Sequence, residues 1–71
     1  MEFNVVQTSG SFRNEIGVMS ETEVYAHVRT RLGDDGSVAE NALAELAEKG
    51  AATVQFKDGL GMETFIEIRR I

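Results

Sequence analysis

The chain's single histidine, His27, is the side chain best suited to acid–base or metal chemistry. On a helix, its neighbours four residues away would be Glu23 and Arg31. A general base or a metal ligand is the functional interpretation. A zinc site would need further His or Cys ligands, and the chain has no cysteine and no second histidine. We therefore interpret His27 as a partly exposed residue in a stripe of charges.

The remaining chemistry-bearing residues lack the spacing that a reaction requires. The four serines fit helix caps or turns, and no Gly-x-Ser-x-Gly motif is present. Asp34, Asp35 and Gly36 form a fragment of a calcium loop without the spacing of the full loop. Arg69 and Arg70 could contact a phosphate or a carboxylate, although residues near a chain end are usually solvated. We expect neither an enzyme nor a bound cofactor or metal.

The charge distribution is dominated by an acidic block over residues 34–48. This block holds five of the 12 acidic residues and no basic one, namely Asp34, Asp35, Glu40, Glu45 and Glu48. The remaining residues carry seven acidic and seven basic side chains, so the net charge of −5 belongs to the block. A face that binds nucleic acid would be basic. The sequence therefore argues against direct nucleic-acid binding, even though two short helices could suggest a helix-turn-helix.

We interpret these five acidic residues as a docking surface for a basic patch on another protein. Carboxylates can occupy phosphate positions, so such a surface suits a site that normally holds nucleic acid. Small acidic inhibitors from phages and mobile elements act in this way, and the comparison rests on charge alone. The alternatives are a solvated helix face, or a small-ligand binder or minor enzyme. That enzyme or binder would have a pocket between sheet and helices and use His27, Tyr25 or an arginine.

Length and composition limit the class of protein. A chain of 71 residues predicts one domain, residues 1–71, with a thin core. A hydrophobic content of 42% argues against disorder. The apolar runs are too short to cross a membrane and none resembles a signal peptide, so we expect a cytoplasmic protein.

The first helix is predicted over about residues 21–32. Ser20 and Glu23 form a capping box at its start, and Gly33 ends it. Its buried stripe consists of Val24, Tyr25, Val28 and Leu32. A short connection to the next helix predicts a helical hairpin.

The second helix is predicted over about residues 38–49. Ser37 with Glu40 forms a capping box at its start, and Gly50 supplies its left-handed end. Small residues dominate the face predicted to be buried, which consists of Ala39, Ala42, Leu43, Leu46 and Ala47. Such a face lets a helix lie close to its support, and it leaves the glutamates on the opposite side.

The first predicted hairpin joins residues 1–8 to residues 12–18 around Ser9 and Gly10. Its register places Thr8 opposite Ser11 and Phe3 opposite Ile16. One face then collects the apolar residues Met1, Phe3, Val5, Phe12, Ile16 and Val18, with Val6 as an apolar exception on the other face. The alternative for the second segment is a loop.

The second predicted hairpin joins residues 51–57 to a strand that runs to about residue 70. The turn from Asp58 to Gly61 fits type I, with Gly61 in the left-handed region. In this register Val54 faces Ile66, while Lys57 faces Glu63.

The resulting order, ββααββ, predicts an α+β two-layer sandwich, with an antiparallel four-stranded sheet and a helical hairpin on one face. The strand order stays open, although the last strand could pair with the first. The predicted core comprises Phe3, Val5, Phe12, Ile16, Val24, Tyr25, Val28, Leu32, Leu43, Leu46, Val54, Phe56, Ile66 and Ile68. Val6 and Phe65 on the outer sheet face, or an open edge, favour a homodimer, whereas the net charge opposes it.

Overall fold

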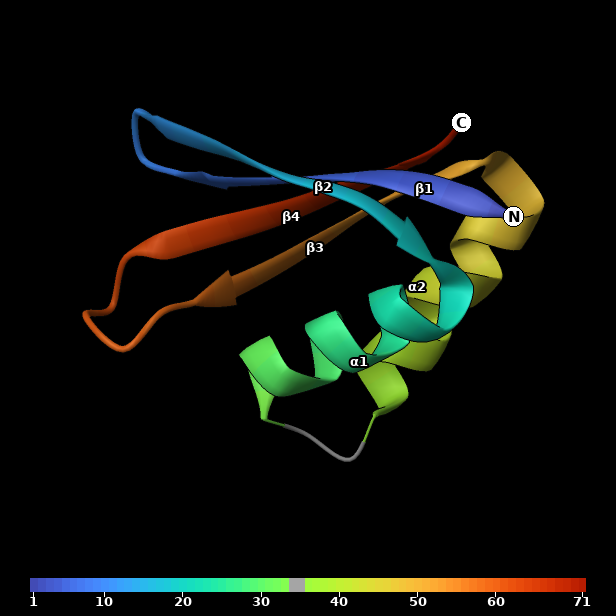
Figure 1. The fold of residues 1–71 in the computed structure, drawn as a ribbon. Helices are drawn as coiled ribbons and strands as arrows, with labels where there is room; N and C mark the ends of the chain where they lie inside the picture. Colours follow the sequence, from blue (N-terminus) through green and yellow to red (C-terminus); the bar gives the residue numbers. More distant parts are fainter. Residues whose placement is uncertain (34–35) are drawn as a thin grey trace.

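The computed structural model describes residues 1–33 and 36–71 and has the predicted order ββααββ (Figure 1). Four strands form one antiparallel sheet in the order β2-β1-β4-β3. They are β1 (Glu2–Ser9), β2 (Phe12–Ser20), β3 (Ala51–Lys57) and β4 (Glu63–Arg70). Helices α1 (Glu21–Leu32) and α2 (Ser37–Lys49) pack against one face of the sheet. The α+β prediction is confirmed, and pairing of β1 with β4 joins the two hairpins.

The predicted start of α1 and the ends of both helices are confirmed. The Ser20 side chain accepts a hydrogen bond from the Glu23 N–H at 3.3 Å, and Glu23 Oε1 accepts one from the Ser20 N–H at 3.0 Å. Gly33 and Gly50 both adopt left-handed conformations, with φ of 65° and 75°. Each donates its N–H to the carbonyl four residues earlier, at 2.8 Å. These bonds satisfy backbone groups that the helix ends would leave unpaired.

The predicted start of α2 is wrong by one residue. Ser37 is the first helical residue, and Gly36 is the N-cap, with φ 97° and ψ 0°. The carbonyl of Gly36 accepts the N–H of Glu40 at 2.9 Å. Gly36 is buried, and a Cβ atom at this position would overlap the Tyr25 hydroxyl oxygen. A glycine therefore starts the helix because both its backbone angle and its contact with α1 exclude a side chain.

The first hairpin differs from the predicted register. Ser9 lies opposite Phe12, so Gly10 and Ser11 form the turn, and Gly10 takes its positive φ of 61°. A positive φ at the first turn residue alone is the pattern of a type II′ turn, which places glycine first. Compared with the prediction, the pairing moves by two residues. Since side chains alternate along a strand, this shift keeps the predicted faces near the turn.

A β-bulge reverses the alternation further along β2. Val5 lies opposite Gly17 and Val6 opposite Glu15, so Ile16 is the extra residue. Beyond the bulge, Val18 points to the outer face and is 53% exposed, although the predicted register placed it inside. The extra residue is the physical reason for this error.

The second hairpin confirms its predicted turn and register. Gly61 has φ 81° and donates its N–H to the Asp58 carbonyl at 3.0 Å. The Asp58 carboxylate accepts the N–H groups of Leu60 and Met62, at 2.9 and 3.0 Å. Val54 lies opposite Ile66, as predicted. The local chemistry of the turn is therefore sufficient to set the pairing of β3 with β4.

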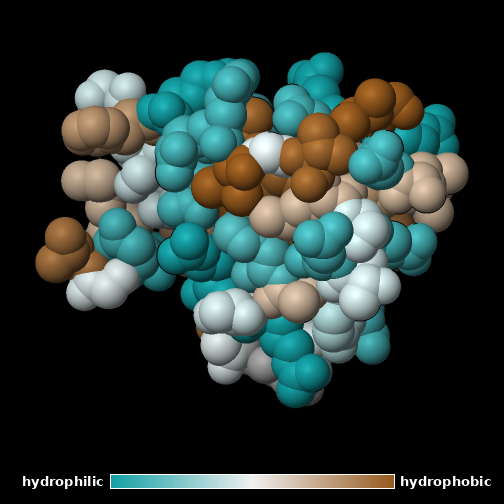
Figure 2. Space-filling model, in the orientation of Figure 1, coloured by the Kyte–Doolittle hydropathy of each residue, from teal (hydrophilic) through white to brown (hydrophobic). Residues whose placement is uncertain are grey.

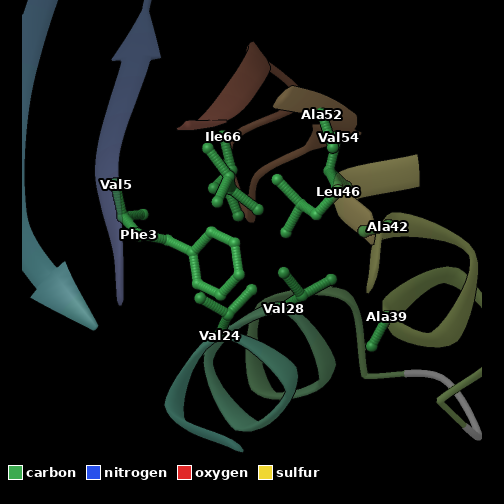
Figure 3. Close-up of a cluster of buried hydrophobic side chains, with 11 residues drawn as sticks. Phe3, Val5, Val24, Val28, Ala39, Ala42, Leu46, Ala52, Val54 and Ile66 are labelled. Atoms are coloured by element: carbon green, nitrogen blue, oxygen red, sulfur yellow. The ribbon is translucent and has the colours of Figure 1, made fainter. Parts of the chain in front are cut away.

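Side chains from both layers meet in one core (Figure 3). Phe3 from β1 and Leu46 from α2 converge with Val24 and Val28 of α1. Eight of the predicted core residues are buried: Phe3, Val5, Val24, Val28, Leu46, Val54, Ile66 and Ile68. Five more are partly buried and pack against this cluster: Ile16, Tyr25, Leu32, Leu43 and Phe56. Ala39 and Ala42 are also buried, as the small-residue face of α2 predicts, whereas Ala47 is exposed.

The sheet extends beyond the helices at its two hairpin turns (Figure 1). Phe12 was predicted in the core, but it is 80% exposed because it lies beside the first turn, where no helix covers the sheet. Leu60 in the second turn is 93% exposed, and Figure 2 shows hydrophobic surface at that tip. Both chain ends lie at the opposite end of the sheet, where the Ile71 N–H donates to the Glu2 carbonyl at 3.1 Å.

Candidate functional site

The acidic face of α2, defined as Glu40, Glu45 and Glu48, points to solvent. All three glutamates are exposed, and Ala42 and Leu46 on the other side of the helix are buried against the sheet. The small buried face fixes the helix close to the sheet, so the acidic side chains must project outward. In the described ranges 1–33 and 36–71, the only ion pair is elsewhere, between Arg13 and Glu15 at 3.9 Å. The three carboxylates are thus available to a partner.

Two of the five predicted docking residues, Asp34 and Asp35, lie outside the described residues. The structure therefore places three of the five, and it brings these three together on one helix. Because α2 is rigidly seated by its core residues, the spacing of its carboxylates is fixed by helical geometry rather than by loop conformation.

A groove between α2 and the edge strand β3 was not foreseen from the sequence. It has a volume of about 190 Å³, and Glu45 of the acidic face lines it. Four apolar residues that are buried or partly buried line it as well: Leu32, Val38, Ala42 and Val54. The other lining residues are exposed and polar: Asn41, Thr53 and Gln55. The polar residues of β3 and the four-residue spacing of Asn41 and Glu45 were visible in the sequence, but their proximity follows only from the strand order.

His27 is half-buried on α1, and it has no catalytic partner among the described residues. Burial lowers the pKa of its imidazole, and the neighbouring charge of Arg31 lowers this pKa further. Its Nε2 atom is buried without a hydrogen-bond partner in the described part of the chain. Glu23, the neighbour on the other side in sequence, is engaged in the capping box, whose hydrogen bonds lower its carboxyl pKa. Within residues 1–33 and 36–71, no acid or nucleophile is hydrogen-bonded to this Nε2 atom.

The outer sheet face holds a second depression, of about 180 Å³, around Val6. Its lining combines two arginines with a carboxylate and an amide: Arg13, Arg69, Glu67 and Asn4. Val6 is only 5% exposed and Phe65 is half-buried, whereas Val18, which the bulge turns to this face, is 53% exposed. The homodimer through this face stays a prediction. Light scattering over a concentration series tests it, with Phe65→Ser expected to lower the mass.

A third depression lies between the two helices. It measures about 480 Å³ and is lined by Glu21, Thr22, Tyr25 and Leu43. It is shallow and open, whereas ligand pockets bury most of their ligand. Within residues 1–33 and 36–71, no three His, Asp or Glu side chains gather in a group that could hold a metal ion.

Comparison with protein-family models, with curated proteins and with solved structures finds no match to this chain. No helix in the described part of the chain is long and apolar enough to cross a membrane.

Proposed function

We propose that this chain is a non-enzymatic protein-binding module that docks the acidic face of α2 on a basic surface of another protein. The observation that carries the proposal is the exposure of Glu40, Glu45 and Glu48 on one rigid helix. Carboxylates at fixed spacing can accept the same hydrogen bonds from Lys and Arg side chains as phosphates do. The partner surface would be one that normally holds nucleic acid, and the chain would act as an inhibitor by occupying it.

The docking chemistry also fits the rest of the surface. The net charge of −5 attracts a basic partner over a distance of about one Debye length, roughly 8–10 Å in physiological salt. An alternative ligand-binding or enzymatic role has less support, because the groove between sheet and helices is smaller than the roughly 300 Å³ at which small-molecule pockets begin. No described acid–base pair converges on that groove either.

The test compares two triple charge reversals of equal net charge. The test variant combines Glu40→Lys, Glu45→Lys and Glu48→Lys, and the control combines Glu2→Lys, Glu15→Lys and Glu21→Lys, which are exposed on other elements. Immobilised wild type and both variants capture proteins from cells that produce the chain, at low and high salt. We expect a partner that the wild type and the control retain and that the test variant loses. Double-stranded DNA or RNA should displace this partner.

A partner captured equally by the test variant, with unchanged salt dependence, would refute docking through the acidic face. Circular dichroism of the three proteins shows whether each retains the fold. Because association between opposite charges is steered electrostatically, the affected rate constant should be the association rate.

A further inference from the structure

Strand β3 is an open edge of the sheet, because it pairs only with β4. The Arg70 N–H donates to the Gly50 carbonyl at 2.8 Å, and the Asp58 N–H donates to the Met62 carbonyl at 3.0 Å. Hydrogen-bonded pairs recur every second residue in an antiparallel ladder, so the even-numbered residues of β3 bond to β4. Thr53 therefore directs its N–H and C=O groups away from β4, toward the open edge.

Gln55 directs its backbone groups outward by the same alternation, which leaves two N–H donors and two carbonyl acceptors in a row with Thr53. The β3 register is continuous from Ala51 to Lys57, as a strand-pairing template requires. The other edge strand, β2, differs because its bulge at Ile16 interrupts the ladder. Bulges blunt an edge against pairing, so β3 is the edge that can accept a further strand.

The groove beside α2 adds side-chain recognition to this edge. Its volume of about 190 Å³ is below the roughly 300 Å³ of small-molecule pockets, but it suits a side chain or two of an extended segment. Leu32, Val38 and Ala42 offer an apolar surface, and Glu45 at the same groove offers a negative charge. Residues two apart on an added strand point to the same side, so one apolar and one basic side chain could enter together.

Charge selects the occupant of the groove. A basic side chain complements Glu45, for which the described residues provide no ion pair. Two copies of this chain paired through β3 about a two-fold axis would instead bring two acidic α2 helices to the same side of the sheet. Repulsion between like charges opposes this arrangement.

We infer that the groove between β3 and α2 binds an extended segment of a partner protein, which adds a fifth strand at Thr53 and Gln55. The segment carries an apolar residue and a Lys or Arg two positions apart, with both side chains facing α2. The inference rests on the proposed function, since it gives the basic partner a second contact beside the acidic face. Strand addition supplies main-chain affinity, and the groove supplies sequence preference.

Synthetic pentapeptides test the inference without knowledge of the partner. The probe is acetyl-Thr-Val-Thr-Lys-Thr-amide, which places Val and Lys on one face of a strand. One control peptide replaces Lys by Glu, and another places Lys next to Val, on opposite faces. Titration into the isotope-labelled chain, followed by two-dimensional NMR, should shift the amide resonances of Thr53 and Gln55 with the probe and far less with either control.

Two chain variants of equal charge change locate the basic side chain. Glu45→Lys should weaken binding of the probe by roughly three- to tenfold, because it replaces an attraction by a repulsion. Glu21→Lys lies on α1, at an exposed position outside the groove and outside the acidic face, and it should leave probe binding unchanged. N-methylation of the peptide at odd or at even positions should abolish binding in one case only, since only alternate amides face β3.

Shifts that lie away from β3, equal effects of Glu45→Lys and Glu21→Lys, or no response at millimolar probe would overturn the inference. Shifts of Thr53 and Gln55 that follow chain concentration rather than peptide would identify a second copy as the occupant, and would also overturn it. Partner capture that still depends on the acidic face would then show that the proposed function survives. Binding of the probe without partner capture through the acidic face would show that the groove binds an extended segment and that the proposed function fails.

Discussion

Gly36→Ala should lower the free energy of unfolding, because it adds a methyl group where α2 begins against α1. Its φ of 97° lies in the region that favours glycine, and a Cβ there would overlap the Tyr25 hydroxyl oxygen and lie 3.2 Å from Cζ. Gly33 provides a matched control, since its φ is 65° and a Cβ would meet nothing within 4 Å. Both Gly→Ala changes carry the backbone strain and the same reduction in unfolded-state entropy, and only one carries the contact.

The magnitudes follow from these two terms. A left-handed conformation costs a non-glycine residue about 1–2 kcal/mol, which is the expected loss for Gly33→Ala before the smaller entropy gain. Displacing a packed side chain adds about 1–3 kcal/mol, so Gly36→Ala should lose roughly 2–5 kcal/mol of unfolding free energy. In a domain of this size, each kcal/mol corresponds to a melting-temperature change of about 4–8 °C.

Urea unfolding of the wild type and both variants measures the difference, with the m-value checked for constancy. Tyr25→Phe then completes a double-mutant cycle, because it removes the oxygen that the new methyl group would overlap. Gly36→Ala should cost about 0.5–3 kcal/mol less in that background. Equal costs for Gly36→Ala and Gly33→Ala, or no coupling to Tyr25→Phe, would refute the account of how α2 begins.

Three further predictions concern stability and its pH dependence. Leu46→Ala, at a side chain 1% exposed, should cost about 2–5 kcal/mol, whereas Leu60→Ala at the exposed turn should change stability by less than about 0.5 kcal/mol in the same denaturant assay. Ser20→Ala should cost about 0.5–2 kcal/mol. The lowered folded-state pKa of Glu23 contributes stability that is present above its ordinary pKa of 4.5 and is lost as the pH falls below this value. Ser20→Ala should reduce this acid sensitivity without removing it, because alanine keeps the backbone N–H that is the larger cause of the lowered pKa and loses only the side-chain hydrogen bond. Burial lowers the pKa of His27 from its ordinary 6.5, so the free energy of unfolding should decline as the pH falls from about 6.5 toward the folded-state pKa. A flat profile in this range, or a profile that His27→Gln leaves unchanged, would contradict the assigned burial.

The local features of this fold were determined by the sequence itself. The capping box of Ser20 with Glu23, the helix ends at Gly33 and Gly50, and the turn that begins at Asp58 each involve residues within a few positions of one another. Such interactions have a low cost in chain entropy, so a short stretch of sequence is enough to specify them. The alternation of apolar residues similarly predicted the α+β class and most of the core.

The tertiary structure alone decided the features that depend on distant parts of the chain. The N-cap of α2 is Gly36 and not Ser37, and the close contact with Tyr25 leaves no room for a side chain at that position. The bulge at Ile16 shifts the pairing of β2 with β1 by one residue, and it turns Val18 outward. Pairing of β1 with β4 leaves β3 at an edge, and only then does Glu45 of α2 come to line a groove beside an open strand. The acidic residues could be read directly from the sequence, whereas their position beside that strand follows from packing between segments that no local pattern connects.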